Sequence, residues 1–148
     1  MKKYILPILF MSLFYWSCEE ESDSEVTLWG VTYSIGWIRD STYLDLSNSD
    51  LTGEIPPEIG NLTNLDYLDL GDNDLTGEIP PEIGNLTKLE ELHLGDNALT
   101  GKIPDNICNL TINWISSYDF SIDSNQLCPP YPSCIEDYVG EQDTTNCD

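Results

Sequence analysis

Residues 51–63 read LTGEIPPEIGNLT, and residues 75–87 repeat the same letters. The two full units, 51–74 and 75–98, differ at only five of 24 positions. Half a unit (YLDLSNSD) precedes them, and a third unit starts at Leu99 with LTGKIPDNICNLT. Self-similarity at a fixed period of this length is typical of solenoids, in which copies of one structural unit stack and bury a shared core. The repeat therefore predicts a stacked architecture.

Within each unit, apolar and polar residues alternate, as in Leu68-Asp69-Leu70 and Leu92-His93-Leu94. This alternation is typical of a strand with one buried face. Copies one period apart should pair in parallel, about 4.8 Å from one another, and build a curved sheet. An asparagine ends each strand, where an inward amide can satisfy backbone groups as the chain turns. These residues are Asn73, Asn97 and Asn125, with the shorter Ser49 in the first unit.

A glycine and an Ile-Pro pair follow the first three of these positions, at Ser49, Asn73 and Asn97, beginning at Gly53, Gly77 and Gly101. Glycine gives the backbone conformational freedom, and the residue before a proline prefers an extended conformation. The pattern predicts an extended turn that returns along the convex side of the solenoid.

The full pattern L-x-L-x-x-N-x-L-T-G-x-I-P-x-x-I-G-N-L resembles the leucine-rich repeat in its 24-residue plant-type variant, over about residues 41–135. The resemblance implies an α/β-type solenoid dominated by β structure, with a short curved parallel sheet of about four repeats. It also implies protein or glycan ligands on the concave face. Upstream, LWGVTYS resembles the N-terminal cap of this family, but Tyr33 stands where the cap cysteine would be. We therefore do not expect the usual N-terminal disulfide.

The fourth unit departs from the repeat. Residues 112–127, INWISSYDFSIDSNQL, contain four more residues than the pattern needs. Phe120 and Ile122 still match the two inward strand positions, so we expect a fourth strand with a bulging insert. The next stretch, LCPPYPSCIE, aligns with LTGEIPPEIG and predicts a rewritten half unit that caps the open end of the solenoid.

Four cysteines fall in the last 41 residues: Cys108, Cys128, Cys134 and Cys147. An even set in an exported chain predicts two disulfides, although four cysteines allow three pairings and the sequence does not choose among them. A zinc site is disfavoured because there is no C-x-x-C pair and the single histidine, His93, lies in another segment.

The N-terminus has the order of a secretory signal. Lys2 and Lys3 precede an apolar run that ends at Trp16, and a small Ser17 follows. The run is too short to cross a bilayer. Ser17-Cys18 at its end resembles a bacterial lipoprotein signal, which implies lipidation of Cys18; plain secretion is the alternative. We divide the chain into a signal peptide (1–17), an acidic tether (18–26), an N-terminal cap (27–40), the repeats (41–127) and a C-terminal cap (128–148).

Beyond the signal, three basic and 27 acidic residues give a formal charge of −24. Such a chain has no basic patch that could neutralise phosphates, so we exclude nucleic acid as a partner. An anionic membrane surface would also repel it, so membrane contact should come only through a lipid anchor. We expect a soluble monomer at the cell surface or outer membrane, or a secreted one.

The outward strand positions form a grid on the predicted concave face. One column is Tyr43, Tyr67, Glu91 and Asp119, and the next is Asp45, Asp69, His93 and Ser121. Two of the five differences between the full repeats, Tyr67/Glu91 and Asp69/His93, fall on this grid. A constant scaffold with a varied face is what a binding surface requires, although exposed positions also vary when nothing restrains them.

The sequence gives little support for catalysis on this face, so we do not expect an enzyme. His93 is the only obvious base near neutral pH, with Asp69 as a plausible cross-strand neighbour. The carboxylates of Asp45, Asp69, Asp72 and Asp96 could share a weak calcium ion, but the aspartate is also simply part of the repeat. No other cofactor is indicated.

The sequence thus favours an exported, surface-anchored module that binds a protein or glycan. We expect the contact patch to comprise Tyr43, Tyr67, Asp69, Glu91 and His93, with the aromatic rings as anchors. The alternative is a structural spacer that has no specific ligand and whose acidic coat serves only solubility.

Overall fold

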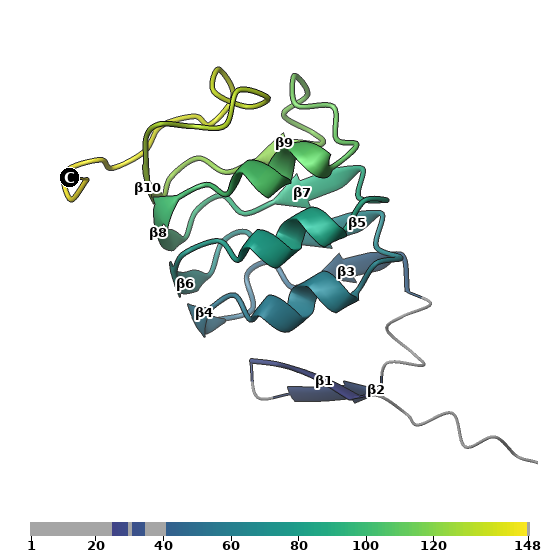
Figure 1. Cartoon of the computed structure of the whole chain (residues 1–148). Coiled ribbons are helices and arrows are strands. Elements are labelled where there is room, and N and C mark those ends of the chain that lie inside the picture. The colour runs from purple at the N-terminus through teal and green to yellow at the C-terminus, as the bar shows by residue number, and fades with distance from the viewer. Residues whose placement is uncertain (1–24, 30, 35–40, 148) are drawn as a thin grey trace, which may run out of the picture.

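The computed structural model describes residues 25–29, 31–34 and 41–147. The predicted signal peptide, Cys18 and most of the acidic tether lie outside these residues. Four rungs stack one above the other, with a β-hairpin below the first and the C-terminal segment above the last (Figure 1). Each rung contributes one strand to each of two parallel sheets, of which the repeat period predicts the first.

The first sheet consists of β3 (Tyr43–Asp45), β5 (Tyr67–Asp69), β7 (Glu91–His93) and β9 (Phe120–Ser121), in that order. Its strands are parallel and pair one repeat apart, so that Tyr43 lies beside Tyr67 and Tyr67 beside Glu91. The expected alternation is confirmed, because Leu68, Leu92 and Phe120 are buried while their strand neighbours face solvent. We call the solvent side of this sheet the outer face.

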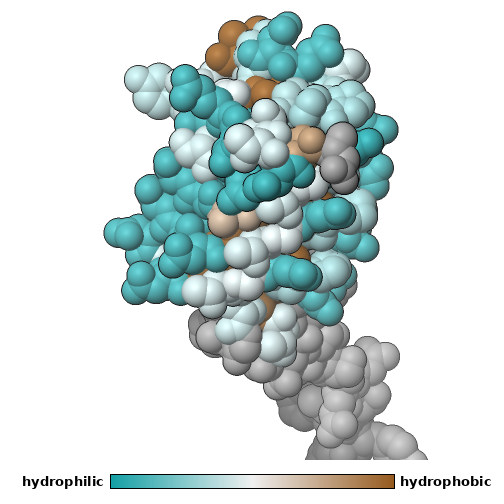
Figure 2. Space-filling model, turned by 90° about the vertical axis from the view of Figure 1, so that its left-hand side faces the viewer, coloured by the Kyte–Doolittle hydropathy of each residue, from teal (hydrophilic) through white to brown (hydrophobic). Residues whose placement is uncertain are grey.

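A second parallel sheet was not anticipated. It consists of β4 (Thr52–Glu54), β6 (Asp74–Gly77), β8 (Ala98–Lys102) and β10 (Gln126–Cys128). The sequence had predicted only an extended turn here, because Gly and exposed Thr and Glu hide the strand signal. Stacking repeats this extended segment at the strand spacing, so its backbone groups pair between rungs. Figure 2 views this side and shows a pale band of near-neutral residues between hydrophilic flanks.

Short 3₁₀ helices connect the second sheet to the next rung: η1 (Pro57–Asn61), η2 (Pro81–Asn85) and η3 (Asp105–Asn109). Each turns one isoleucine into the core. Glycine in the first two helices permits close stacking, since a Cβ on Gly60 would lie 2.6 Å from the carbonyl oxygen of Glu82. Cys108 occupies the same repeat position in η3, above which no further helix of this kind follows.

Asparagine side chains tie successive rungs together, as the sequence predicts. The amide oxygen of Asn97 accepts the N–H of Leu75 at 3.0 Å, and its nitrogen donates to the carbonyls of Leu70, Leu94 and Gly95 at 2.9–3.2 Å. Asn73 and Asn125 make the equivalent bonds one rung below and above. The hydroxyl of Ser49, the shorter residue of the first rung, donates within its own turn to the carbonyl of Ser47, while its backbone N–H donates to Asn73 Oδ1 at 3.0 Å.

The C-terminal segment continues the stack above the fourth rung through hydrogen bonds that the sequence did not reveal. Gln142 takes the asparagine role: its amide oxygen accepts the N–H of Leu127 at 3.2 Å and its nitrogen donates to the carbonyls of Ile122 and Val139. The backbone beside it pairs with the exit of β9, where Ser124 N–H donates to Glu141 C=O at 2.8 Å. The cap therefore satisfies the polar groups that the last repeat would otherwise expose.

Two disulfides fix this cap, and both are within the set that the sequence predicts. Cys108 of η3 bonds to Cys134, and Cys128 at the end of β10 bonds to Cys147. The pairing itself was open from sequence. The first bond joins the last repeat helix to the cap, and the second joins the last strand to the chain end.

At the other end, β1 (Glu25–Leu28) and β2 (Val31–Ser34) form an antiparallel hairpin. Leu28 is buried in the shared core and Trp29 packs against it. The hairpin therefore covers the first rung in the region predicted as the N-terminal cap. Among the residues that the structure describes, no helix is long and apolar enough to span a bilayer.

Replacing Asn97 by alanine should lower the free energy of unfolding by about 2–4 kcal/mol, because the backbone groups of two buried leucines, Leu75 N–H and Leu70 C=O, lose their side-chain partner. Urea unfolding followed by circular dichroism measures the change. The matched control is Asn106→Ala, since Asn106 is exposed and makes one long bond of 3.4 Å. Equal stability of the two variants would contradict a structural role for the asparagine bonds.

Candidate functional site

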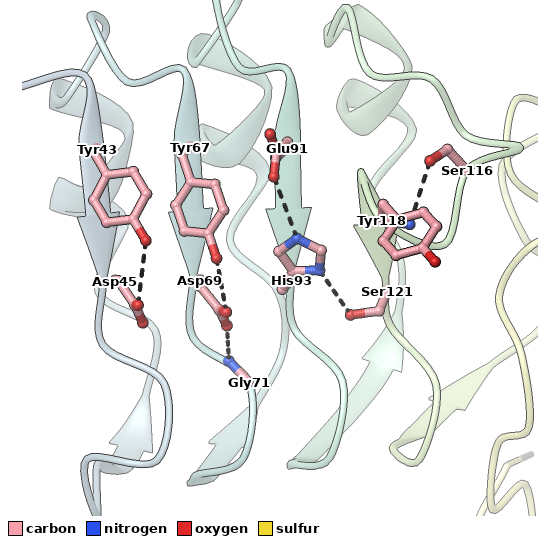
Figure 3. Close-up of polar contacts among 10 residues, drawn as sticks. All are labelled: Tyr43, Asp45, Tyr67, Asp69, Gly71, Glu91, His93, Ser116, Tyr118 and Ser121. Carbon is pink, nitrogen blue, oxygen red and sulfur yellow. Dashed lines mark hydrogen bonds and ion pairs between the residues drawn. The ribbon is translucent and has the colours of Figure 1, made fainter.

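Three rings lie side by side across the outer face. The rings of Tyr43 and Tyr67 are stacked, with centroids 4.3 Å apart and planes 12° from parallel. The imidazole of His93 follows at 5.8 Å from Tyr67, tilted by 49° (Figure 3). Tyr43 and Tyr67 are register partners on β3 and β5, whereas His93 of β7 is the register partner of Asp69, two residues along the strand from Glu91, which lies beside Tyr67. We call these three rings the aromatic row.

Carboxylates hold the tyrosine hydroxyls. Tyr67 donates to Asp69 at 3.1 Å, and Tyr43 makes a longer bond of 3.4 Å to Asp45. Asp69 in turn accepts the N–H of Gly71 at 2.8 Å. Each tyrosine is thus tied to a carboxylate two residues along its own rung, which orients the ring along the strand.

These contacts shift two pKa values. Burial raises the pKa of the Tyr67 phenol, and the neighbouring Asp69 carboxylate raises it further. The hydroxyl and backbone N–H of Ser47 donate to Asp45 at 2.7 and 3.0 Å and lower the pKa of that carboxyl. Tyr67 therefore stays a neutral donor, and Asp45 an anion, near neutral pH.

His93 has different partners from those that the sequence suggests. Asp69 is its register neighbour on β5. The imidazole nevertheless contacts Ser121 through Nδ1 at 3.1 Å and Glu91 through Nε2 at 3.9 Å. The sequence places Ser121 in the same column of outward positions as His93, and the two are register partners on β7 and β9, but it does not single out their contact. The two contacts hold the ring in place beside Tyr67.

The insertion places two large apolar side chains in solvent. Ile115 is 77% exposed and Tyr118 is 86% exposed, whereas the core of the same rung is closed. Tyr118 lies near Ser121 at the end of the aromatic row (Figure 3). The bulge itself was predicted from the four extra residues, but its exposed apolar pair was not singled out.

The proposed calcium ligands do not converge. Asp72 and Asp96 lie in left-handed turns at the strand exits, both with φ of 53°, and are exposed. Asp45 and Asp69 are engaged with tyrosines on the strands. Within residues 25–29, 31–34 and 41–147, no three acidic, histidine or cysteine side chains are grouped to hold a metal ion. A weak calcium site stays a prediction without geometric support.

Comparison with known families agrees with this architecture. The model described as "Leucine Rich repeats (2 copies)" matches residues 63–109, and the model "Leucine Rich Repeat" matches residues 42–62. Residues 42–109 are therefore leucine-rich repeats. The plant-type assignment rests on the solved structures to which the repeats are similar.

Three of these structures show the range of relatives. A chain of the BIR3–SERK2 complex from Arabidopsis thaliana is 34% identical, with a TM-score of 0.58, over 67% of this chain and 53% of that one. A chain of the Arabidopsis receptor kinase HAESA complex with the peptide hormone IDA and the co-receptor SERK1 is 34% identical, with a TM-score of 0.63, over 73% and 18%. A plant ice-binding protein is 37% identical, with a TM-score of 0.55, over 66% and 30%.

This leucine-rich repeat protein thus spans about half or less of these relatives. No curated protein sequence matches the chain. These relatives include a receptor kinase and an ice-binding protein on one architecture, so the shared fold alone does not decide the ligand.

The state of Tyr67 gives a test of the site geometry. In a spectrophotometric titration, the difference between wild type and Tyr67→Phe should show a phenol that ionises above the ordinary tyrosine value of 10.0. Asp69→Asn should lower this pKa only part-way, because burial, the larger cause, remains. If Asp69→Asn leaves the curve unchanged, the Tyr67–Asp69 bond is not formed in solution.

Proposed function

We propose that this leucine-rich repeat protein is an exported, non-catalytic module that binds a protein or glycan on the outer face of its first sheet. The observation that carries the proposal is the aromatic row. Tyr43 is 56% exposed although it is already stacked on Tyr67. Large aromatic rings held in place before binding lose little conformational entropy when a partner covers them, which is how aromatic anchors contribute affinity.

The distribution of sequence changes supports the same face. Outward strand positions differ between the two full repeats at Tyr67/Glu91 and Asp69/His93, whereas the leucines beneath them are identical. Stacked repeats place these altered side chains on adjacent strands. The buried leucines are thus the same in both repeats while the outward side chains differ, as a recognition surface requires.

A protein ligand is the better supported class. The solved structures to which the chain is similar include complexes described as holding a peptide hormone and a co-receptor. Sugars remain chemically suitable for the tyrosine rings, and they enter the test below as a separate arm.

Binding, rather than catalysis, also fits the chemistry of the face. His93 and Ser121 form a polar pair, but they lie on an open sheet surface without the enclosed pocket that would exclude water from a reaction. We assign the pair a positioning role, because it holds the third ring of the aromatic row.

Export is supported by the two disulfides, which persist in oxidising compartments. We further propose a lipid on Cys18, with the acidic tether separating the repeats from the membrane. The formal charge of −24 beyond the signal keeps the module off an anionic surface, so attachment depends on the lipid.

Capture on the immobilised full chain tests the binding proposal, with secreted proteins and surface glycans of the source cell as separate arms. We expect Tyr67→Ala combined with His93→Ala to abolish capture, because it removes the central and third rings of the row. The control is Tyr138→Ala, a 41% exposed tyrosine of the cap. A parallel lane with a calcium chelator tests the metal hypothesis.

Circular dichroism checks that the double variant remains folded, since loss of ring stacking should lower stability by only about 1 kcal/mol. A partner captured equally by wild type and the folded double variant would refute the outer face as the site. Capture of nothing above background would favour a structural spacer.

Lipidation has its own test. Cys18→Ala should move the protein from the membrane fraction to the medium while the repeats keep their melting temperature, because Cys18 precedes the repeats in the sequence. Cell fractionation and metabolic labelling with a fatty acid measure the change. An unlabelled wild-type chain in the medium would instead establish plain secretion.

A further inference from the structure

The insertion loop, residues 113–119, joins η3 to the last strand of the first sheet and ends beside the aromatic row. It presents Ile115 and Tyr118, which are 77% and 86% exposed. Single exposed apolar residues need no explanation, but two within four residues of a loop at the end of an aromatic row form a patch. No other described residue covers these two side chains.

The loop is held in one shape. Trp114 packs edge-to-face on Phe120 with centroids 5.0 Å apart, which anchors one end of the loop to the core. Ser116 accepts the N–H of Asp119 and of Phe120 at 3.0 Å, and its own N–H donates to Asn113. The exposed pair is therefore presented by an ordered turn, and binding would not have to order it.

A small hollow lies at the foot of the loop. It has a volume of about 280 Å³ and is lined by Glu90, Glu91, Thr111, Asn113 and Asp119. This is at the lower limit of small-molecule pockets, and it suits one side chain of a larger partner. Glu91 also contacts His93, so the hollow continues directly from the aromatic row.

The charge of the surrounding residues determines which kind of partner side chain the hollow can accept. The strands of the first sheet carry no lysine or arginine, while Asp45, Asp69 and Glu91 all face outward. Lys88 donates to Asn64 outside these strands, and Lys102 ends β8 on the second sheet. An acidic partner would meet uncompensated repulsion here, whereas a basic one would be attracted and oriented.

The dimensions favour an extended segment. From β3 to β9, where the insertion loop ends, the outer face crosses three strand spacings, or about 14 Å. An extended chain of four or five residues covers that length at about 3.3 Å per residue.

Resting on the proposed function, we infer that the partner is a protein that presents a basic, extended segment. The segment crosses the aromatic row from Tyr43 to His93, places a lysine or arginine in the hollow at Glu91, and packs an apolar residue against Ile115 and Tyr118. The insertion loop is thereby the element that distinguishes this binding face from a plain stack of repeats.

A display library of short random linear peptides, selected on the immobilised full chain, tests this inference. We expect enriched peptides to be basic with at least one apolar residue, and their affinity to fall as salt rises. Measured with the synthetic peptide, Tyr118→Ser combined with Ile115→Ser should raise Kd by about tenfold or more, and Glu91→Gln by about threefold to tenfold. Tyr138→Ser and Glu136→Gln, exposed residues of the cap, are the matched controls and should leave Kd within about twofold.

Enrichment of neutral or acidic peptides would overturn the inference, as would a Kd that the Ile115/Tyr118 variant leaves unchanged. A peptide with its basic residues replaced by glutamate must also fail to bind. If no peptide is enriched although a natural partner is captured through Tyr67 and His93, the basic segment is wrong and the proposed function stands. If neither the peptide selection nor the capture experiment detects binding, both the basic segment and the proposed function are rejected.

Discussion

The structure depends on one interaction, the side-chain amide that joins each rung to the next. A backbone that turns between two sheets leaves N–H and C=O groups pointing inward, and these groups need hydrogen-bond partners. Asn97 satisfies one donor and three acceptors, and four such amides stack through the molecule when Gln142 is included. Because every amide contacts two rungs, the spacing of the whole stack follows from this bond.

Fixed spacing also explains the candidate site. Parallel strands about 4.8 Å apart place equal repeat positions side by side, which is close to the stacking distance of aromatic rings. Tyr43 and Tyr67 lie one period apart in sequence, so the strand spacing by itself brings their rings to the stacking distance of 4.3 Å. The change from tyrosine to glutamate at position 91 ends the column, and His93 continues the row from the next position along β7.

The C-terminal end of the stack is closed by a cap rather than by another repeat. Repeat helices pack so closely that Gly60 has no room for a side chain, yet the last helix has no such neighbour above it. The position can then carry Cys108, which bonds to Cys134 and holds the cap in place. The cap lets a short solenoid end without an exposed core, and it lies beside the insertion that carries Tyr118.

Sequence alone determined the period, the inward leucines, the asparagine positions and the fourth strand at Phe120, because each is a local pattern that stacking repeats. It also placed Tyr67 and His93 on one face. Tertiary structure decided what depends on neighbours distant in the chain. The second sheet forms only when extended segments meet between rungs, the disulfide pairing follows from which cysteines the cap brings together, and His93 contacts Ser121 and Glu91 rather than Asp69. The paired cysteines lie 26 and 19 residues apart and the repeat pattern includes no cysteine, so the repeat does not specify which of them meet.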